Sequence, residues 1–452
     1  MAENKMGVQP IPKLLFGMSL PIIISMLVQA MYNVVDSIFV SQISEDALTA
    51  VSLVFPVQNL LLAFSIGTAV GMASLLSRNL GEKNFNGVNK AATNGIFLAV
   101  ISAIIFAILG ISLSGTFFAT QTNNMAGNRD IIVKYGIEYM DIISACSIFV
   151  FLQITFERLL QSTGKAVPSM ISQALGAIVN IILDPILIFG YFGLPEMGVA
   201  GAAIATVIGQ FCGLLLGFIF NCKINKEIKL SFKGFRPHGG TIKSIYAVGA
   251  PSIVVQAIGS VMTFGMNKIL VPFTSTAATV FGVYFKLNSF VFMPVFGLTN
   301  GMIPIAAYNY GARNRDRIIK TYKLSAIAAV IFMLIGLAVF CLFPAQLLGI
   351  FNASPDMIAI GTPALRIISL SFAFGGYCII TGCLFQALGN GVYSLWVSLV
   401  RQIFILLPSA AILANVFGLD AVWWSFPIAE IFSLVLTTLL LKRIYRLKLK
   451  NL

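Results

Sequence analysis

The feature that most constrains this chain is a series of apolar runs, each about 20 residues long, that recur along its whole length. Twelve such runs can be counted, and they begin near Leu14, Leu48, Ala91, Ile131, Val167, Val199, Ile245, Ala277, Leu324, Ala359, Val392 and Ala421. A helix of this length crosses the hydrocarbon core of a bilayer. Because 58% of the residues are hydrophobic and only 10% are charged, a soluble core could not hide this apolar surface. We therefore expect an all-α polytopic membrane protein with twelve transmembrane helices.

The net charge of +13 is distributed unevenly between the expected loops. If the N-terminus is placed inside and the loops are assigned alternately, only Arg129 and Lys134 fall on the outer side, whereas the other Lys and Arg residues outside the spans fall on the inner side. This pattern predicts that both termini are cytoplasmic. The basic charge then reflects topology, so we expect no nucleic-acid partner.

The polar stretch 1–12 is followed by no small-residue cleavage site, which argues against a signal peptide.

An internal repeat divides the chain. Residues 67–84 align without gaps on residues 297–314. Six positions are identical at an offset of 230: Gly67, Gly71, Met72, Asn79, Gly81 and Asn84 recur as Gly297, Gly301, Met302, Asn309, Gly311 and Asn314. An even number of spans separates the copies, so the halves share one orientation. We expect two pseudo-symmetric six-helix lobes, residues 1–222 (spans 1 to 6) and 241–452 (spans 7 to 12), joined by a cytoplasmic linker loop at residues 223–240.

One span carries a carboxylate where the bilayer makes a charge costly. Asp184 lies inside the apolar run 171–190, and an aspartate at the centre of a spanning helix costs about 2.5 to 3.5 kcal/mol. Asn180 is four residues earlier and therefore on the same helical face. Pro185 lacks an N–H and crowds the carbonyl of Ile181, so we expect the helix to bend there and to free a backbone oxygen. A carboxylate, an amide and a free carbonyl on one face indicate a site for a proton or a small hard cation.

Several segments of the chain resemble the multidrug and toxic compound extrusion (MATE) transporters, in the bacterial branch that includes DinF-like and MepA-like exporters. The segments are MYNVVDSIFV, SRNLGEKN, RLLQSTGKAVPSM, NIILDPILIFG, GVAGAAIAT and FVFMPVFGLTNGMIPIAAYNYGARN. The resemblance implies two lobes that form a V-shaped central cavity, and a cation-coupled (H⁺ or Na⁺) antiporter that exports amphipathic, cationic drugs or toxic compounds by alternating access. It implies no enzyme activity, no cofactor beyond the coupling ion, and small-molecule substrates. It also implies a functional monomer in the bilayer of a bacterial plasma (inner) membrane.

The resemblance also carries over a set of cation-coupling residues in the N-lobe. They are Asp36 in span 1, Asn180 and Asp184 in span 5, and Thr206 in span 6. The match at Thr206 is looser, because the preceding loop carries extra length. Counted from the starts of their spans, all three helices place these residues in the outer half of the bilayer, so they can meet. Two carboxylates in a low-dielectric pocket should not both ionise without a bound cation, so the pair can hold and release a proton or Na⁺. A purely structural role for both acids is the alternative.

Other residues have candidate roles. The candidate cavity and substrate residues are Gln29, Asn33, Tyr139, Gln153 and Lys286. Pro21 in span 1 and Pro185 in span 5 are candidate hinges, although a fixed kink explains Pro21 equally well. Arg401 and Glu430 should lie near mid-membrane and form a pair that is mainly structural. The six cysteines show no CxxC spacing, so we expect no metal site beyond a possible Na⁺ site.

Two other function classes remain to be weighed. A flippase for lipid-linked or amphipathic anionic substrates would need a basic cavity; Lys268, Lys286 and Arg401 favour this alternative, whereas the N-lobe acids and the span count oppose it. A membrane-embedded enzyme or a primary pump is not favoured, because the chain has no HExxH, GxSxG, DxxD or nucleotide-binding motif. The sequence identifies neither the substrate nor the coupling ion.

Overall fold

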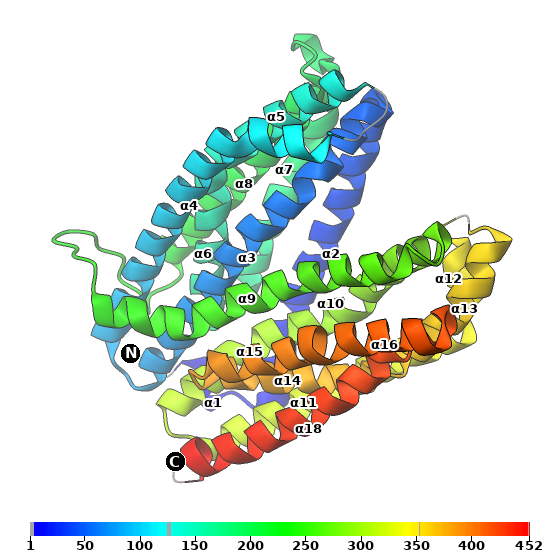
Figure 1. Ribbon diagram of the computed structural model, residues 1–452. Helices are drawn as coiled ribbons and strands as arrows, with labels where there is room; N and C mark the ends of the chain where they lie inside the picture. The colour runs from blue at the N-terminus through cyan, green and yellow to red at the C-terminus, as the bar shows by residue number, and fades with distance from the viewer. Residues whose placement is uncertain (1–3, 124–127, 352, 451) are drawn as a thin grey trace. The chain divides into compact units, whose positions relative to one another are not determined.

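A computed structural model of the chain describes residues 4–123, 128–351, 353–450 and 452. Over these residues every regular element is a helix (Figure 1). Ten of these helices are long and apolar enough to cross a membrane, or up to twelve when two bent helix pairs each count as one span. The predicted all-α membrane fold with twelve spans is therefore confirmed for the described residues.

The chain divides into two compact units, which we call the N-unit (Ile24–Gly249) and the C-unit (Met1–Ile23 with Ala250–Leu452). The N-unit contains the later part of α2 (Ile11–Ile43), then α3 (Glu45–Gly81), α4 (Phe85–Gln121), α5 (Arg129–Ala145), α6 (Ser147–Ser162), α7 (Ala166–Phe189), the 3-10 turn η1 (Tyr191–Gly193), α8 (Gly198–Lys223) and the start of α9 (Gly239–Leu270). The lobe boundaries expected from the repeat lie at the end of α8 and the start of α9, and they remain a prediction.

The C-unit contains the remaining helices. They are α1 (Lys5–Val8), the start of α2, the later part of α9, α10 (Ser275–Gly311), α11 (Arg315–Leu342), α12 (Pro344–Gly349), α13 (Pro355–Ser369), α14 (Phe372–Ala387), α15 (Gly391–Leu399), the π-helix η2 (Val400–Leu406), α16 (Leu407–Phe417), α17 (Leu419–Val422), α18 (Ser425–Ile444) and the π-helix η3 (Tyr445–Leu449). Both α2 and α9 pass from one unit to the other within a few residues of a proline, Pro21 and Pro251, which occupy equivalent repeat positions.

The internal repeat corresponds to the same helix–turn–helix in each unit. The helices α3 and α10 are both 37 residues long, and each ends on the repeated motif. In the turn that follows, Lys83 and Arg313 both adopt left-handed backbone, with φ of 57° and 55°. The next residue caps the following helix in both copies: Asn84 Oδ1 accepts from the Gly87 N–H, and Asn314 Oδ1 accepts from the Arg317 N–H. The shared turn gives Asn84 and Asn314 the same capping role at an offset of 230.

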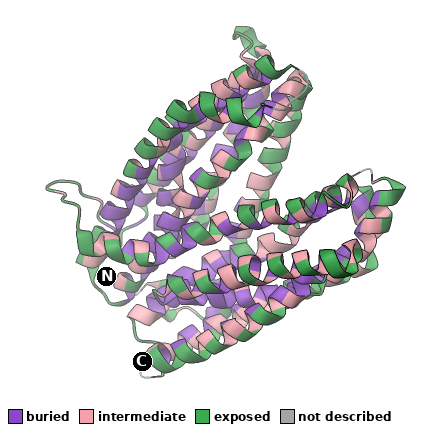
Figure 2. Ribbon diagram, in the orientation of Figure 1, coloured by how far each residue is buried: buried purple, intermediate pink, exposed green. Residues whose placement is uncertain are grey.

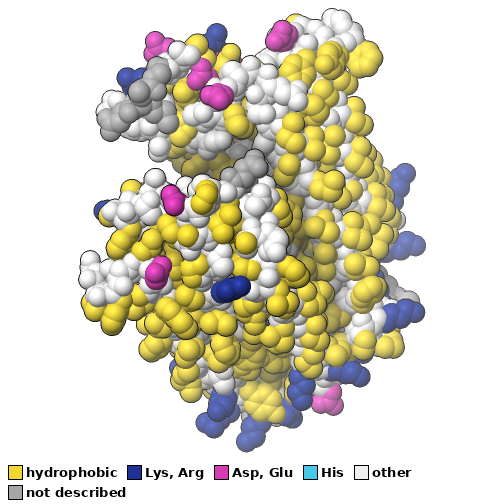
Figure 3. All heavy atoms as spheres, turned by 90° about the vertical axis from the view of Figure 1, so that its right-hand side faces the viewer, with side chains coloured by type: hydrophobic (Ala, Val, Ile, Leu, Met, Phe, Trp, Pro, Cys, Tyr) yellow, Lys and Arg dark blue, Asp and Glu magenta, His cyan; other side chains and the backbone are white. Residues whose placement is uncertain are grey.

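The faces of the spans differ in how they are buried (Figure 2). On α4, Ile104, Ile108 and Ile111 are 48%, 60% and 48% exposed, whereas Ala99 and Ala103 on the same helix are buried. This spacing gives the helix one packed face and one bare apolar face. In the view of Figure 3, hydrophobic side chains cover the sides of the helices and Lys and Arg gather at their lower ends. Exposed apolar stripes of this kind are the surface that lipid covers.

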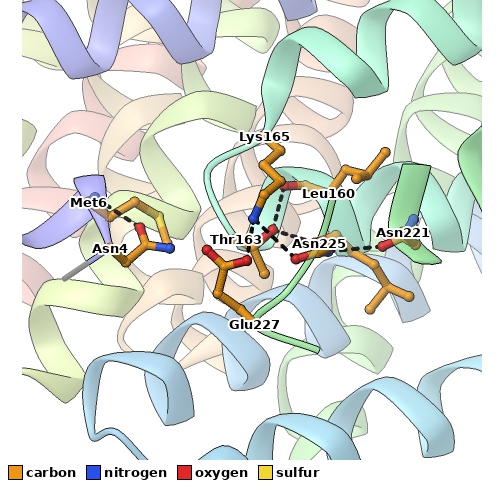
Figure 4. A network of polar contacts seen from close by, with 9 residues as sticks. Asn4, Met6, Leu160, Thr163, Lys165, Asn221, Asn225 and Glu227 are labelled. Atoms are coloured by element: carbon orange, nitrogen blue, oxygen red, sulfur yellow. Dashed lines mark hydrogen bonds and ion pairs between the residues drawn. The ribbon is translucent and has the colours of Figure 1, made fainter. Parts of the chain in front are cut away.

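The segment 224–238, between α8 and α9, is packed against the N-unit. Lys165, just before α7, forms an ion pair with Glu227, and its Nζ donates to Asn225 Oδ1 at 3.3 Å (Figure 4). Farther along, the Lys229 N–H donates to Asn89 Oδ1 on α4 at 2.8 Å. The connection between the two halves of the chain is thus fastened to the N-unit at several points.

Candidate functional site

The helices α7 and α8 touch backbone to backbone. A Cβ on Gly209 would lie 2.5 Å from the Gly176 carbonyl oxygen, and one on Gly201 would lie 2.6 Å from the Leu187 carbonyl oxygen. Real Cβ atoms do not approach so closely, so the glycines are what permits this contact, as small residues do between membrane helices. The close approach brings polar side chains from the two helices within bonding range.

Asn180 joins the two helices at the middle of this contact. Its Nδ2 donates to Asp184 Oδ1, one turn later on α7, and to Thr206 Oγ1 on α8, both at 3.3 Å. Asp184 is 0% exposed and Asn180 is 2% exposed. Among the described residues, the two remaining oxygens, Asn180 Oδ1 and Asp184 Oδ2, have no hydrogen-bond donor. Buried polar atoms nearly always have a hydrogen-bond partner, so these two acceptor oxygens indicate a site for a proton or a cation.

Asp36 on α2 extends the same cluster. Its Oδ1 is also buried without a hydrogen-bond donor among the described residues. Asp36 lies within electrostatic range of Asp184, and Tyr32 and Tyr139 lie within electrostatic range of both carboxyl groups. The structure thus brings together the residues carried over by resemblance from three helices, α2, α7 and α8.

An apolar cluster closes the site at one end. Val40 follows Asp36 by one turn on α2, Ile188 follows Asp184 by one turn on α7, and Ala202 precedes Thr206 by one turn on α8. All three are 0% exposed and belong to one hydrophobic cluster, which also includes Tyr139. Because α8 runs opposite to α2 and α7, these residues all lie on the same side of the polar group. Apolar side chains therefore pack on this side of the polar group.

The candidate cavity residues of the N-unit have different surroundings. Gln29 Oε1 accepts from Gln173 Nε2 at 3.0 Å, which links α2 to α7. The Tyr139 hydroxyl accepts from Gln58 Nε2 at 3.4 Å, which links α5 to α3. Asn33 is exposed. Gln29 and Tyr139 are thus engaged in contacts between helices, whereas the Asn33 side chain lies at the surface of the N-unit.

Gln153 on α6 is paired with an acid that the sequence reasoning missed. Its Nε2 donates to Glu157 Oε1 at 3.0 Å, and Glu157 is 6% exposed. Glu157 could have been found by the signal used for Asp184, a lone carboxylate in an apolar run. Tyr32 was also missed, although it lies four residues before Asp36 as Asn180 does before Asp184. Gln58 carried no signal, because its proximity arises from packing between helices.

Three of the remaining candidates, Lys286, Arg401 and Glu430, lie in the C-unit, and Pro185 lies within α7. Lys286 is in the C-unit, where its Nζ lies 5.9 Å from the centre of the Phe351 ring. In the same unit Arg401 Nη1 lies 3.2 Å from Glu430 Oε1. The helix α7 continues through Pro185 to Phe189.

The MatE family model matches residues 21–186 and 251–412, one match in each half of the internal repeat. The chain is similar to multidrug export protein MepA of Staphylococcus haemolyticus (strain JCSC1435), at 25% identity over 92% of this chain and 90% of that protein. MepA of Staphylococcus aureus (strain MSSA476) is 26% identical over 93% of this chain and 91% of its own length.

Solved structures share the fold. One, of a multidrug resistance MATE family transporter of the MOP superfamily in the outward-facing conformation, matches with a TM-score of 0.91 at 24% identity over 99% of both chains. Another, of a MOP superfamily transporter from Pyrococcus furiosus, matches with a TM-score of 0.90 at 24% identity, again over 99% of both chains.

Proposed function

This chain belongs to the MatE family, and from that premise we propose that it is a cation-coupled (H⁺ or Na⁺) antiporter that exports amphipathic, cationic compounds by alternating access. The relatives named as multidrug exporters support the direction and the breadth of transport. The single observation that carries the cation coupling is the buried cluster in which Asp36, Asn180 and Asp184 each present an oxygen without a donor among the described residues.

The donor atoms of this cluster suit a proton or Na⁺. Asp36 Oδ1, Asp184 Oδ2, Asn180 Oδ1 and Thr206 Oγ1 are all hard oxygen ligands, which favour ions of this kind over soft transition metals. Among the described residues no group of three or more His, Cys, Asp and Glu side chains is placed to hold a metal ion. In this proposal the cation neutralises the paired carboxylates, and Asn180 and Thr206 orient them.

Coupling requires the cation and the substrate to prefer opposite conformations of the transporter. Cation binding to Asp36 and Asp184 removes the repulsion between α2 and α7, so these helices can pack more closely in the loaded state. Because α2 passes from one unit to the other near Pro21, a change in its packing at Asp36 can be transmitted along the same helix. In this proposal the helices bend at Pro21 and Pro185, which act as hinges.

A single chain supplies both units, so in this proposal the transporter works as a monomer in the plasma membrane, with both termini in the cytoplasm.

A cationic substrate is favoured over an anionic one. The N-unit site contributes two carboxylates, whereas in the C-unit the charge of Arg401 is neutralised by Glu430. Lys286 is an exposed side chain near the Phe351 ring, so it does not complete a basic cavity with Arg401 on the contacts seen here. These surroundings weaken the case for a flippase of lipid-linked or amphipathic anionic substrates.

The proposal is tested by ethidium movement in proteoliposomes under an imposed pH gradient and, separately, an imposed Na⁺ gradient. We expect one gradient to drive transport in the wild-type protein and the Asp36→Asn variant to lose it. Asp130→Asn is the matched control, because Asp130 is an exposed acid at the start of α5 in the same unit. Folded wild-type protein that moves ethidium under neither gradient would reject cation-coupled export of such compounds.

A further inference from the structure

A groove of about 420 Å³ lies in the C-unit, and its lining includes none of the candidate cation-site residues. Its lining residues come from α11, α14 and α18, which are labelled in Figure 1, and from the π-helix η3, which directly follows α18. The volume falls within the range of pockets that hold drug-sized ligands.

The floor and the rim of the groove differ in chemistry. Ile318, Leu384 and Leu449 form an apolar floor and are 0%, 1% and 2% exposed. Lys323 on α11, Lys442 in the last turn of α18 and Arg446 in η3 form the rim, and all three are exposed. An occupant of this groove must therefore combine an apolar body with an anionic end.

Among the described residues, no acidic side chain pairs with the cations of the rim. The lining contains no Asp or Glu. Of the ion pairs formed between described residues, none involves Lys323, Lys442 or Arg446. A fourth cation lies beside them, because Arg315 Nη2 donates to the Tyr445 hydroxyl and its guanidinium lies 5.3 Å from the centre of the Tyr445 ring.

The local backbone helps to build the groove. The residues from Tyr445 to Leu449 form a π-helix, a form that appears as short segments often found at functional sites. Within this segment Tyr445 and Arg446 lie at the exposed mouth, while Leu449 is turned into the floor. On the facing helix, the Tyr322 hydroxyl bonds Thr381 Oγ1 at 3.0 Å, which fixes that wall against α14.

We propose that this groove is a binding site for an anionic glycerophospholipid of the cytoplasmic leaflet, with its phosphate among Lys323, Lys442 and Arg446 and the upper part of an acyl chain over Ile318 and Leu384. The groove lies where α11 begins and α18 ends, at the basic ends of both helices, which the positive-inside rule assigns to the cytoplasm. Basic pockets between transmembrane helices on that side suit lipid phosphate groups. A free inorganic phosphate would leave the apolar floor unused, and an uncharged apolar molecule would leave the cations unpaired.

The test is native mass spectrometry of the full-length protein in detergent, incubated with equal amounts of phosphatidylglycerol and phosphatidylcholine. We expect the wild-type protein to retain phosphatidylglycerol preferentially. The triple variant Lys323→Gln, Lys442→Gln, Arg446→Gln should lose this preference, by roughly five-fold for each cation that pairs with the phosphate. The matched control is Lys320→Gln, Arg443→Gln, Lys450→Gln, which removes three exposed cations outside the groove lining and should keep the preference.

A second variant separates a built site from general surface charge. Leu441→Trp places a bulky side chain in the half-buried wall and leaves every cation in place. We expect it to lose the retained phosphatidylglycerol as the triple variant does, in protein that stays monodisperse. Equal retention of both lipids by the wild type would overturn the site. So would equal loss in both triple variants, or undiminished phosphatidylglycerol in Leu441→Trp.

Discussion

Asn180 Nδ2 lies 3.3 Å from Thr206 Oγ1, so an amide on α7 is bonded to a hydroxyl on α8 at the level where the two backbones touch through Gly176 and Gly209. The same nitrogen lies 3.3 Å from Asp184 Oδ1. The orientation of the buried carboxylate therefore depends on how closely the two helices pack.

The glycine contact should be intolerant of a single methyl group. In Gly209→Ala the new Cβ would lie 2.5 Å from the Gly176 carbonyl oxygen, which is backbone and cannot move aside. We expect α7 and α8 to separate, at a cost of about 1 to 3 kcal/mol, with a lower Tm and lost export. Gly115→Ala is the control, because a Cβ there meets nothing within 4 Å. An unchanged Tm in Gly209→Ala would show that the helices are not held this closely.

The Thr206 hydroxyl should matter more than its methyl group. Thr206→Val keeps the shape but removes the acceptor for Asn180 Nδ2, which we expect to cost on the order of 1 kcal/mol and to reduce export. Thr206→Ser keeps the hydroxyl and should retain most of the activity. Export assays at matched expression, with Tm in detergent, check both variants; equal behaviour of Val and Ser at this position would contradict a role for the hydroxyl.

The two N-unit carboxylates should be needed for export but not for insertion. Asp36→Asn and Asp184→Asn remove a titratable charge at nearly constant shape, so both proteins should reach the membrane at wild-type levels and lose drug resistance at least ten-fold, the change expected when about 1.4 kcal/mol or more of coupling is removed. Resistance is measured in cells with expression checked by immunoblot. Normal resistance in either variant would show that this acid is structural.

The Arg401 and Glu430 pair should behave as a structural unit. Arg401→Leu or Glu430→Leu alone leaves the partner charge without its ion pair, at a cost on the order of 3 kcal/mol. The double substitution removes both charges and should recover most of that stability and of the export activity. A double-mutant cycle on Tm measures the coupling. A stable double variant without export would instead assign the pair a functional role.

The prolines near the unit boundaries should control the rate of transport rather than cation binding. Pro21→Ala and Pro251→Ala each allow a backbone N–H to return to the helix ladder of α2 or α9, which stiffens the helix where it passes between units. We expect slower ethidium transport with unchanged Tm or a higher one. Pro355→Ala, in the first turn of α13, is the control. Wild-type transport rates in Pro21→Ala would favour a fixed kink over a hinge.

The local sequence grouped Asn180 with Asp184, and the family resemblance together with depth counting added Asp36 and Thr206 from other helices, but other contacts between helices carried no sequence signal. Asn180 and Asp184 share a face because four residues make about one helical turn, and that relationship needed no structure. Tyr32 and Glu157 were within reach of the same reasoning. In contrast, nothing local indicates that Gln58 contacts Tyr139 or that Gln173 contacts Gln29, because each pair joins residues far apart in the chain.

The sequence by itself indicated a membrane protein of about twelve spans, because the thickness of a bilayer sets how many apolar residues a helix needs. It did not determine the helix lengths, since α3, α4 and α10 each run for 37 residues. The sequence also determined the two-fold repeat. In the turn of each copy, the equivalent residues Lys83 and Arg313 adopt the same left-handed backbone conformation. Tertiary structure alone decided that α7 and α8 meet at Gly176 and Gly209, and hence that Thr206 reaches Asn180. Helical periodicity is a local property of the backbone, whereas the choice of which two faces touch depends on the shapes of both surfaces together.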